Sequence, residues 1–475
     1  MPLLVYNSLS GKKEPFTTLT PGLARMYVCG VTVYDHPHIG HARCYVAFDI
    51  IYRHLLARGY RVEYVRNFTD VDDKIIRRAA ELKEDWRALT GRYIASYHQD
   101  MQALGLLPAT VEPKATRHMA EITAAVAGLI NKGHAYALDN GDVYFAVDSF
   151  KPYGQLSGRS PEDMLAGARV EVDERKRNPM DFALWKSAKA NEPSWDSPWG
   201  QGRPGWHIEC SAMSQKYLGE TFDIHGGGKD LLFPHHENEK AQSEALNGRP
   251  FARFWLHNGF VRINQEKMSK SAGNFFTIKD ILKIAPAEGV RLFLLSKHYR
   301  SPLDFSEGAL LDAVSGLERL YTVLAGVAEA GEKIEGEPWG EENAVNDFEK
   351  AMDDDFNSAA AVGVLFALSS EINRLLRAGG RQNLARAKGG ADLLTNLGGR
   401  LGLLRNEPVA FRQNGFVSHG KDIDPVQVES LIAQRHQARA EKNFARADMI
   451  RQQLARLGVV LEDSAKGTKW RAGGK

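Results

Sequence analysis

Two histidines lie three residues apart at the start of an expected helix. His38 and His41 follow an apolar run at 26–29, and they precede a long apolar-periodic segment that ends at Gly59. This order predicts a strand, a turn and a helix, with both imidazoles on one face of the first helical turn. Unpaired backbone N–H groups and the helix dipole favour phosphate there, and Gly40 lets a flat ligand approach the backbone. Taken alone, the segment is more simply a solvated turn with two polar histidines.

A lysine-rich segment far downstream changes this interpretation. Residues 267–271 read Lys-Met-Ser-Lys-Ser, a composition that alone is typical of a solvated loop. Together, the two segments resemble the paired signatures of the class I aminoacyl-tRNA synthetases. Fixed cationic donors in a nearly dry site would lower the barrier to attack on the α-phosphate of ATP. The resemblance implies catalytic roles for His38, His41, Lys267 and Lys270, and an ATP site made of His38, Gly40, His41 and Lys270.

Two cysteines, a histidine and a carboxylate form a candidate metal site. Cys29 closes the first apolar run, Cys210 lies in a later helical segment, and His235 and Glu239 are four residues apart and so share a helix face. Thiolates with an imidazole favour zinc over magnesium or calcium. Each residue alone has a simpler explanation, because a lone cysteine usually lies in a core and a helical His/Glu pair usually lies on a surface. His236 with Glu239 is a local alternative that the spacing leaves open.

These residues lie in longer stretches that resemble one family, the cysteinyl-tRNA synthetases. The likeness extends nearly end to end, through residues 26–35, 38–41, 67–74, 204–210, 233–239, 267–271 and 467–471. The resemblance implies one Zn²⁺ per chain, with the ligands Cys29, Cys210, His235 and Glu239. It also implies a cysteine pocket lined by Gly30, Thr69, Trp206 and His225.

A bound zinc would explain how cysteine is told apart from serine, which differs by one atom. Pockets that act by shape discriminate such neighbours by only about 10- to 200-fold. A thiol placed against Zn²⁺ binds as thiolate, whereas a hydroxyl is a harder and far less acidic ligand. The implied reaction has two steps. The cysteine carboxylate attacks the α-phosphate of ATP, which carries Mg²⁺, giving cysteinyl-adenylate and pyrophosphate. The 3′-terminal ribose of tRNA(Cys) then takes the acyl group, and AMP leaves.

The composition is that of an ordinary globular protein. The 475 residues are 43% apolar and 25% charged, with a net charge of +2. The N-terminus lacks the features of a signal peptide, and no apolar run approaches the ~20 residues of a membrane span. Three cysteines are too few for a disulfide framework, which favours a reducing cytosol. We therefore expect a cytoplasmic monomer with no membrane partner.

Strands that alternate with helices predict an α/β fold with a Rossmann-like, doubly wound parallel sheet, followed by an all-α C-terminal half. Ligands of such sheets lie beyond the carboxyl ends of the strands. The pattern changes at 111–204, which resembles the family's connective insertion. The expected domains are a split catalytic domain at 1–110 and 205–265, the insertion at 111–204, a lysine-loop region at 266–308, a helical bundle at 309–405, a linker at 406–423 and an anticodon-binding module at 424–475.

Two further motifs have structural explanations. The acidic run at 70–73 could bind a metal, but an aspartate that caps the helix beginning at Lys74 explains it more simply. The glycine run at 226–228 is a weak phosphate-loop signal, and a tight turn is the commoner explanation.

The last expected module carries an excess of positive charge. Residues 424–475 contain ten Lys or Arg against six Asp or Glu. Such a run is usually a solvated helix face, but arginines that meet phosphate and an indole that stacks on a base would suit RNA. The resemblance implies anticodon contacts here, for which the candidates are Arg435, Arg439, Trp470 and Arg471.

Three other functions share parts of this pattern. A ligase that joins cysteine to an amino-sugar, as in mycothiol synthesis, would use the same zinc and ATP residues but no anticodon module. A zinc hydrolase would activate water and leave the ATP signatures idle. A non-catalytic RNA-binding module would need neither the paired histidines nor Lys270. Cysteine-dependent pyrophosphate exchange separates the hydrolase from either ligase.

Overall fold

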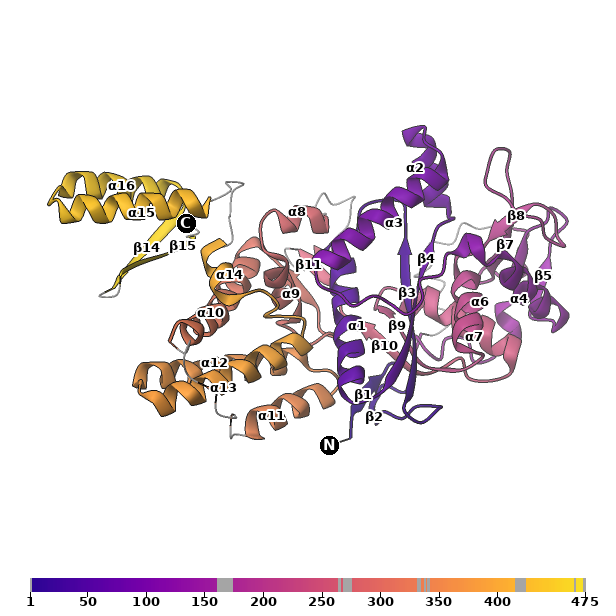
Figure 1. Ribbon diagram of the computed structural model, residues 1–475. Helices are drawn as coiled ribbons and strands as arrows, with labels where there is room; N and C mark the ends of the chain where they lie inside the picture. Colours follow the sequence, from indigo (N-terminus) through magenta and orange to yellow (C-terminus); the bar gives the residue numbers. More distant parts are fainter. Residues whose placement is uncertain are drawn as a thin grey trace. The chain divides into compact units, whose positions relative to one another are not determined.

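Two compact units make up the part of the chain that the computed structural model describes (Figure 1). Unit 1 comprises Met1–Arg262, His298–Leu303 and Met352–Asn357, and unit 2 comprises Ile263–Lys297, Asp304–Ala351 and Ser358–Lys475. The described residues are 2–159, 174–263, 266–267, 276–330, 335–336, 339, 342–414, 424–464 and 467–472.

The centre of unit 1 is a parallel four-stranded sheet in the order β10 (Ala252–Asn258), β9 (Phe222–Gly228), β3 (Leu23–Thr32) and β4 (Arg61–Thr69). Helix α1 (Ile39–Ala57) joins β3 to β4, and α6 (Trp206–Leu218) leads into β9. Figure 1 shows α1 on one side of the sheet and α6 on the other. Because both faces are covered, β3 is a nearly continuous buried run. The predicted doubly wound parallel sheet is confirmed.

Strand β9 continues through the glycine run. A Cβ at Gly226 would lie 2.2 Å from the ring of Phe48 on α1, and a Cβ at Gly227 would lie 2.9 Å from the ring of His236. Glycine is needed here because neighbouring side chains pack directly on the strand backbone. The prediction of a tight turn at 226–228 was therefore wrong.

Helix α1 begins where a reciprocal cap forms between two histidines. His38 Nδ1 accepts a hydrogen bond from Gly40 N (3.1 Å), and His41 Nδ1 accepts one from His38 N (3.2 Å). Such a pair satisfies N–H groups that the first turn leaves without helical partners. The predicted order of strand, turn and helix is confirmed.

The acidic run at 70–73 starts helix α2 (Asp73–Leu82). Asp72 accepts a hydrogen bond from Lys74 N at 2.8 Å, so the capping interpretation is confirmed. Asp73 instead pairs with Arg203, which anchors the start of α2 to the inserted segment.

The inserted segment contains an antiparallel sheet in the order β5 (Ala135–Ala137), β6 (Val143–Phe145), β7 (Phe182–Ser187) and β8 (Gly202–Pro204). Helix α4 (Met119–Asn131) packs against α6 and α7 (Glu237–Asn247). A shared apolar core joins these elements and includes Val126, Leu129, Phe145, Trp185, Ile208 and Ala241. The insertion therefore supports α6 and α7 from the side away from the sheet.

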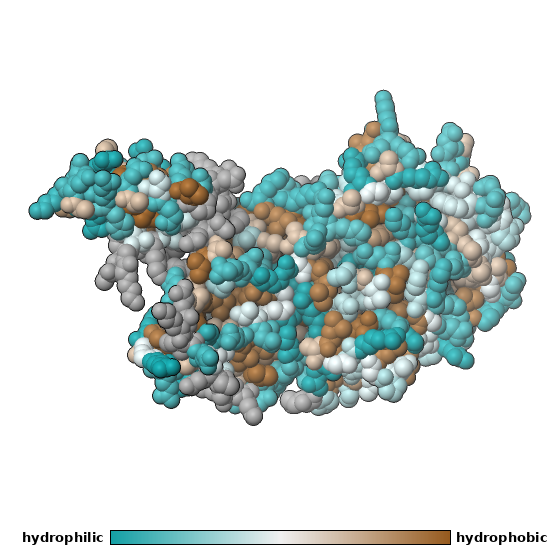
Figure 2. Space-filling view, viewed as in Figure 1, coloured by the Kyte–Doolittle hydropathy of each residue, from teal (hydrophilic) through white to brown (hydrophobic). Residues whose placement is uncertain are grey.

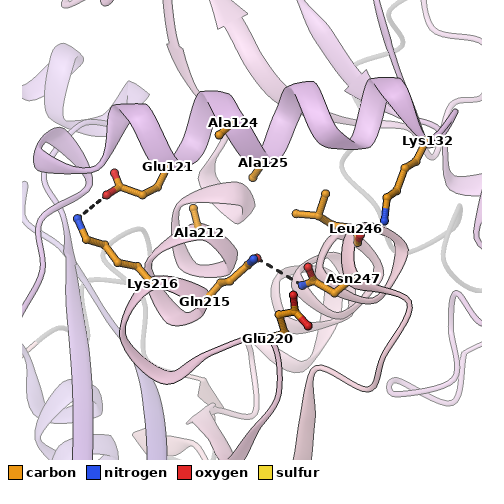
Figure 3. Close-up of a pocket in the computed structure, with 10 residues that line it drawn as sticks. All are labelled: Glu121, Ala124, Ala125, Lys132, Ala212, Gln215, Lys216, Glu220, Leu246 and Asn247. Atoms are coloured by element: carbon orange, nitrogen blue, oxygen red, sulfur yellow. Dashed lines mark hydrogen bonds and ion pairs between the residues drawn. The ribbon is translucent and has the colours of Figure 1, made fainter.

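A cavity of about 610 Å³ lies between α4, α6 and α7 (Figure 3). Two pairs of its polar side chains contact each other, since Lys216 contacts Glu121 and Asn247 Nδ2 donates to Gln215 Oε1 at 3.3 Å. None of the candidate site residues lines this cavity.

The remaining elements of unit 1 flank the main sheet. A hairpin of β1 and β2 contacts β10, and α2 packs on α3. The turn before α7 contains a cis peptide bond between Phe233 and Pro234. The bounds are β1 (Leu4–Asn7), β2 (Lys12–Pro15), α3 (Trp86–Ala103), η1 (Ala115–Arg117), η2 (Val147–Ser149) and η3 (Leu232–His236).

Unit 2 is mainly helical. Within the described residues, one helix, α12 (Ser358–Ala378), has the length and composition of a membrane span, and it packs against α10 (Glu307–Ala330) and α13 (Arg381–Arg400). Its buried residues recur at helical spacing, as in Leu365, Leu368, Ile372 and Leu375. A small sheet in the order β12–β11–β13 is formed by strands that come before α8 and after α9 in the sequence. The bounds are β11 (Val261–Ile263), β12 (Glu266–Lys267), α8 (Ile278–Leu282), α9 (Ala287–Leu295), β13 (Leu303–Phe305), α10 (Glu307–Ala330), α11 (Glu342–Asp353), α12 (Ser358–Ala378), α13 (Arg381–Arg400) and α14 (Pro408–Asn414).

The C-terminal module consists of two antiparallel helices and a hairpin, namely α15 (Pro425–Ala440), α16 (Phe444–Arg456), β14 (Val459–Ser464) and β15 (Gly467–Ala472). Asp424 caps α15 through Val426 N at 2.9 Å. The module has its own apolar core, which includes Val428, Leu431, Ile450, Leu454 and Trp470. Figure 2 shows mostly hydrophilic residues on the visible face of α15 and α16, with apolar residues scattered among them.

Candidate metal and nucleotide site

Cys29, Cys210, His235 and Glu239 converge in the interior of unit 1. All four are buried, and their ligand atoms lie within 4.8 Å of one another. The two sulfurs are 3.9 Å apart, and Glu239 Oε1 is 3.3 Å from Cys29 Sγ and 2.8 Å from His235 Nε2. A tetrahedral ion with Zn–S bonds of about 2.3 Å separates its two sulfurs by roughly 3.8 Å. The donor types and their spacing therefore fit a four-coordinate zinc ion.

Four separate elements bring these donors together. Cys29 lies near the carboxyl end of β3, and Cys210 lies in α6, the helix that leads into β9. His235 belongs to η3 and Glu239 to the first turn of α7, four residues later. The helical spacing places the last two on one face, but only the packing of α6 and α7 against β3 makes the four meet.

The pKa values of the four groups in the cluster are shifted in different directions by burial and by their neighbours. Burial raises the pKa of Cys29 well above its usual value, whereas the hydrogen bond from Cys29 and the neighbouring His235 lower the pKa of Cys210 to about 6. Burial is the largest single influence on His235 and opposes its charge, but Glu239 and Cys210 together raise the pKa of His235 to about 10. Burial likewise opposes ionisation of Glu239, while His235 and His225 hold its pKa well below its usual value. A dication would find a thiolate and a carboxylate here, and His235 would have to release a proton to bind it.

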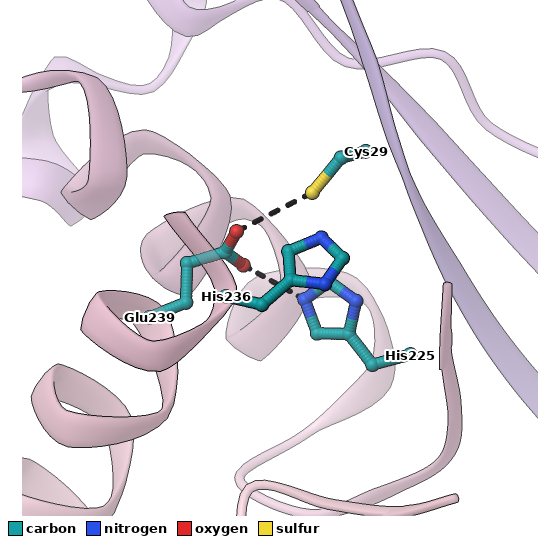
Figure 4. A group of neighbouring side chains, drawn as sticks. All are labelled: Cys29, His225, His236 and Glu239. Carbon is teal, nitrogen blue, oxygen red and sulfur yellow. Dashed lines mark hydrogen bonds and ion pairs between the residues drawn. The ribbon is translucent and has the colours of Figure 1, made fainter. Parts of the chain in front are cut away.

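A second combination of donors shares two of these residues. Cys29, His225, His236 and Glu239 also lie within 4.8 Å of one another (Figure 4). His225 Nε2 is 2.8 Å from Glu239 Oε2, and His236 Nδ1 is 2.8 Å from His257 Nε2. Of the ring nitrogens described, His225 Nδ1 and His236 Nε2 are buried without a hydrogen-bond partner. The alternative that the spacing of His236 and Glu239 left open is thus compatible with the geometry.

The residues of the expected cysteine pocket lie around the cluster. Trp206 stacks on the ring of His235, with 4.2 Å between ring centroids, and it remains 37% exposed. His225 stacks on Trp255 at 4.6 Å. Trp206, which is partly exposed, could therefore cover a ligand at the cluster, whereas His225 is fully buried.

Gly30 and Thr69 lie at the carboxyl ends of β3 and β4. A Cβ at Gly30 would lie 1.5 Å from the carbonyl oxygen of Asn67, so this position has no room for a side chain. Thr69 Oγ1 donates to Glu209 Oε2 at 2.9 Å, and both residues are buried. Glu209 was not among the predicted site residues, although it lies within the 204–210 stretch that resembles the family.

The first turn of α1 brings His38, Gly40 and His41 together. The two imidazoles stack with 3.7 Å between their centroids, and both side chains are partly exposed. One turn further along α1, Tyr45 donates a hydrogen bond to the carbonyl of Cys29 at 3.3 Å. The candidate nucleotide site and the candidate metal site are therefore connected through a single side chain.

The lysine segment is only partly covered by the structure. The backbone of Lys267 belongs to β12, but its side chain lies outside the described residues, as does the whole of Lys270.

The candidate anticodon residues occupy different environments. Trp470 is 6% exposed, packs in the apolar core of the C-terminal module and donates from Nε1 to Glu429 Oε1 at 2.7 Å. Arg435 is also buried and lies 3.3 Å from Thr468 Oγ1. Arg439 is exposed on α15, and the side chain of Arg471 lies outside the described residues. An indole held in this way is not presented to a base.

Comparisons with known proteins agree with these observations. Residues 15–315 match the model of the tRNA synthetases class I (C) catalytic domain, 347–405 match the DALR domain, and 425–471 match the cysteinyl-tRNA ligase anticodon binding domain. The chain is 56% identical over 471 residues to the cysteine–tRNA ligase of Thioalkalivibrio sulfidiphilus, covering 99% of this chain and 100% of the relative. It is also 56% identical over 490 residues to that of Geobacter sulfurreducens, with coverage of 99% and 100%.

The fold is shared with more distant synthetases. A solved structure of Mycobacterium tuberculosis methionyl-tRNA synthetase in complex with methionyl-adenylate has a TM-score of 0.60 at 15% identity, covering 80% of this chain and 90% of that chain. The parallel sheet and the capped helix α1 agree with the full-length likeness to these relatives. The chain therefore belongs to the cysteine–tRNA ligases of the class I tRNA synthetase family.

Proposed function

We propose that this member of the cysteine–tRNA ligases selects cysteine through a zinc ion held by Cys29, Cys210, His235 and Glu239. The observation that carries the proposal is the convergence of these four buried donors at a spacing suited to tetrahedral zinc. The alternative set has one thiol and two imidazoles, and the two-thiol set is the softer one, which favours zinc.

Bound zinc would hold the substrate's sulfur as thiolate and leave the serine hydroxyl without comparable affinity. Two of the proposed ligands favour their charged forms at neutral pH. The pKa of Cys210 is about 6, and the two histidines beside Glu239 hold the pKa of its carboxyl group low. Trp206, stacked on His235, would shield the substrate from water.

The first turn of α1 would receive ATP. Its N–H groups and the positive end of the helix dipole attract phosphate, and His38 and His41 would stabilise the charge that develops when the cysteine carboxylate attacks the α-phosphate. Mg²⁺ on the nucleotide and Lys267 and Lys270 from the lysine segment complete this proposal by resemblance to the family. Gly30 and Thr69 would border the amino acid from the strand ends.

The acyl group would then pass to the terminal ribose of tRNA(Cys). The match of residues 425–471 to an anticodon binding domain supports recognition of the tRNA by the C-terminal module. Arg439 is the exposed candidate on α15, while Trp470 and Arg435 would maintain the module from within its core.

Cysteine-dependent exchange of pyrophosphate into ATP tests the reaction. With zinc-loaded protein, we expect cysteine to support exchange, and serine to fall short by more than the ~200-fold that shape alone achieves. Equal exchange with cysteine and serine would contradict the proposal. Anomalous diffraction at the zinc edge with cysteine bound would identify the protein ligands and the substrate sulfur. Transfer to tRNA(Cys) rather than to an amino-sugar separates the two cysteine ligases.

A further inference from the structure

Three consecutive aspartates extend unit 1 beyond the catalytic family match. Asp353 ends α11, and Asp354 and Asp355 follow it before α12, so all three lie outside residues 15–315 and inside the DALR match at 347–405. Yet 352–357 belongs to unit 1. Asp353 Oδ1 is 3.0 Å from His54 Nε2 in the last turn of α1, and Asp354 pairs with Lys13 on β2.

Asp355 makes the most contacts of the three. It is fully buried, and its Oδ1 accepts hydrogen bonds from Tyr6 N (2.9 Å) and Tyr299 Oη (3.0 Å). Its Oδ2 accepts from Arg300 Nε at 2.6 Å, and its own N–H donates to the carbonyl of Leu4 at 2.9 Å. A buried carboxylate with this many donors is held in one position, since any displacement would leave polar groups unsatisfied.

The backbone around Asp355 has an unusual conformation. Asp355 and Phe356 both have positive φ angles, +60° and +54°. A bulky side chain such as that of phenylalanine rarely adopts this region, and it persists only where surrounding contacts determine it. The Phe356 ring is buried edge-on against His54, with centroids 5.9 Å apart.

The segment 298–301 connects Asp355 to the first turns of α1. Tyr299 and Arg300 bind Asp355 through their side chains, while the carbonyls of the same segment accept hydrogen bonds from Arg43. Arg43 Nη2 lies 2.7 Å from His298 O, 3.2 Å from Tyr299 O and 3.3 Å from Ser301 O.

Arg43 is 1% exposed and follows His41 by two residues on α1. Burial lowers its pKa to about 10, so the guanidinium stays charged at neutral pH and needs these acceptors. Within unit 1, the segment 298–301 is also held by the residue that follows β10, because Gly259 N donates to Tyr299 O at 2.8 Å. A Cβ at Gly259 would lie 2.4 Å from Ser301 O, so the two backbones are in close contact.

We propose that Asp355, Tyr299 and Arg43 are positioning residues for adenylate formation, which together fix the first turn of α1 and hence His38 and His41. A loop from the DALR match thereby supports the start of α1 in unit 1, where the proposed ATP site lies. The reaction concerned is the proposed cysteine activation, and none of these three residues touches the reacting atoms.

The test compares Asp355→Asn with Asp354→Asn. The first replaces a buried acceptor of several donors by an amide of nearly the same shape, and the second makes the same change at a side chain that is 52% exposed. For Asp355→Asn we expect the kcat of cysteine-dependent pyrophosphate exchange to fall at least tenfold, with the KM for cysteine within twofold of wild type. Asp354→Asn should keep both values within twofold.

Tyr299→Phe is a milder second variant, because it removes only the hydroxyl that Asp355 accepts from. We expect its kcat to fall about threefold without loss of folded protein. Amide hydrogen exchange of the peptide at 38–46 gives a readout independent of activity. It should be faster in Asp355→Asn and Tyr299→Phe than in wild type, and unchanged in Asp354→Asn.

The inference is overturned if the folded variants keep wild-type kcat, or if their α1 amides exchange at the wild-type rate. It is also overturned if kcat regains the wild-type value once it is expressed per folded protein, because a purely structural role lowers the apparent kcat only through lost folded protein and leaves KM unchanged. Failure of the proposed function gives a different result, because the wild-type protein would then lack cysteine-dependent pyrophosphate exchange. Amide hydrogen exchange would still decide whether Asp355 positions α1. If Asp355→Asn does not fold, Tyr299→Phe decides it alone.

Discussion

Glu239 joins the two possible sets of metal ligands because its carboxylate oxygens face different histidines. Oε1 contacts His235 and Cys29, while Oε2 contacts His225. This carboxylate contributes to the raised pKa values of His235 and Cys29, and against burial its own pKa is held low by His235 and His225. At the scale of single residues, the site is therefore a set of coupled charges rather than four independent ligands.

Glu239→Gln should lower zinc affinity by at least about tenfold, because a neutral amide is a weaker ligand and leaves His235 without its partner. Zinc content after dialysis against a chelator of known affinity measures the change. Glu220→Gln, an exposed glutamate of unit 1, is the control and should retain wild-type zinc. Wild-type zinc content in Glu239→Gln would indicate that the metal lies elsewhere.

Gly30→Ala tests the close approach of β3 to β4. The added Cβ would meet a backbone oxygen that cannot move aside, so we expect a loss of about 3 kcal/mol or more in the free energy of unfolding. Gly91→Ala on α3 makes the same change where nothing lies within 4 Å, and it should be neutral or stabilising by up to about 1 kcal/mol. Urea unfolding of both variants measures the difference, and equal stabilities would refute the steric account.

At the scale of elements, α1 is the helix that connects the two sites. Its first turn carries the stacked histidines, Tyr45 contacts the Cys29 carbonyl, and His54 in its last turn contacts Asp353. The helix is thus held at several points along its length. Such a rigid support suits a site whose donors must be placed before charge develops.

His38→Asn separates the capping role of His38 from its proposed role in catalysis. Asparagine is a favourable N-cap, so the free energy of unfolding should change by less than about 1 kcal/mol. The variant lacks the imidazole, and we expect adenylate formation to slow by about 100-fold, as for the loss of one preorganised donor. Single-turnover measurements of cysteinyl-adenylate give the rate. A wild-type rate in a fully folded variant would remove His38 from the mechanism.

At the scale of the whole molecule, the matches divide the chain into a catalytic part and parts associated with tRNA. The catalytic model covers 15–315, and the DALR and anticodon-binding matches follow it. Contacts made by the module at 425–471 should therefore affect the transfer step without affecting cysteine activation.

Arg439→Ala should raise the KM for tRNA in aminoacylation and leave tRNA-independent pyrophosphate exchange unchanged. An arginine that meets phosphate contributes a salt-dependent attraction, so the difference from wild type should shrink as salt is raised. Arg61→Ala, at an exposed arginine of unit 1, is the matched control. An unchanged KM for tRNA at low salt would exclude Arg439 from the interface.

Much of the local structure could be predicted because it depends on residues close in sequence. The start of α1 after 26–29 and the Asp72 cap of α2 follow from side chains that bond backbone groups two or three residues away. The parallel sheet followed from the alternation of strands and helices. The glycine run at 226–228 was misinterpreted because the reason for its glycines, the ring of Phe48, comes from a distant helix.

The donor types, the start of α1 and the likeness to a family can be recognised in the sequence. The fold alone shows that Cys29, Cys210, His235 and Glu239 share one interior, that Trp470 belongs to a core, and that Asp355 belongs to unit 1. The difference lies in the range of the interactions. Caps and helix faces depend on neighbours within a turn, whereas burial and convergence depend on the packing of elements far apart in the chain.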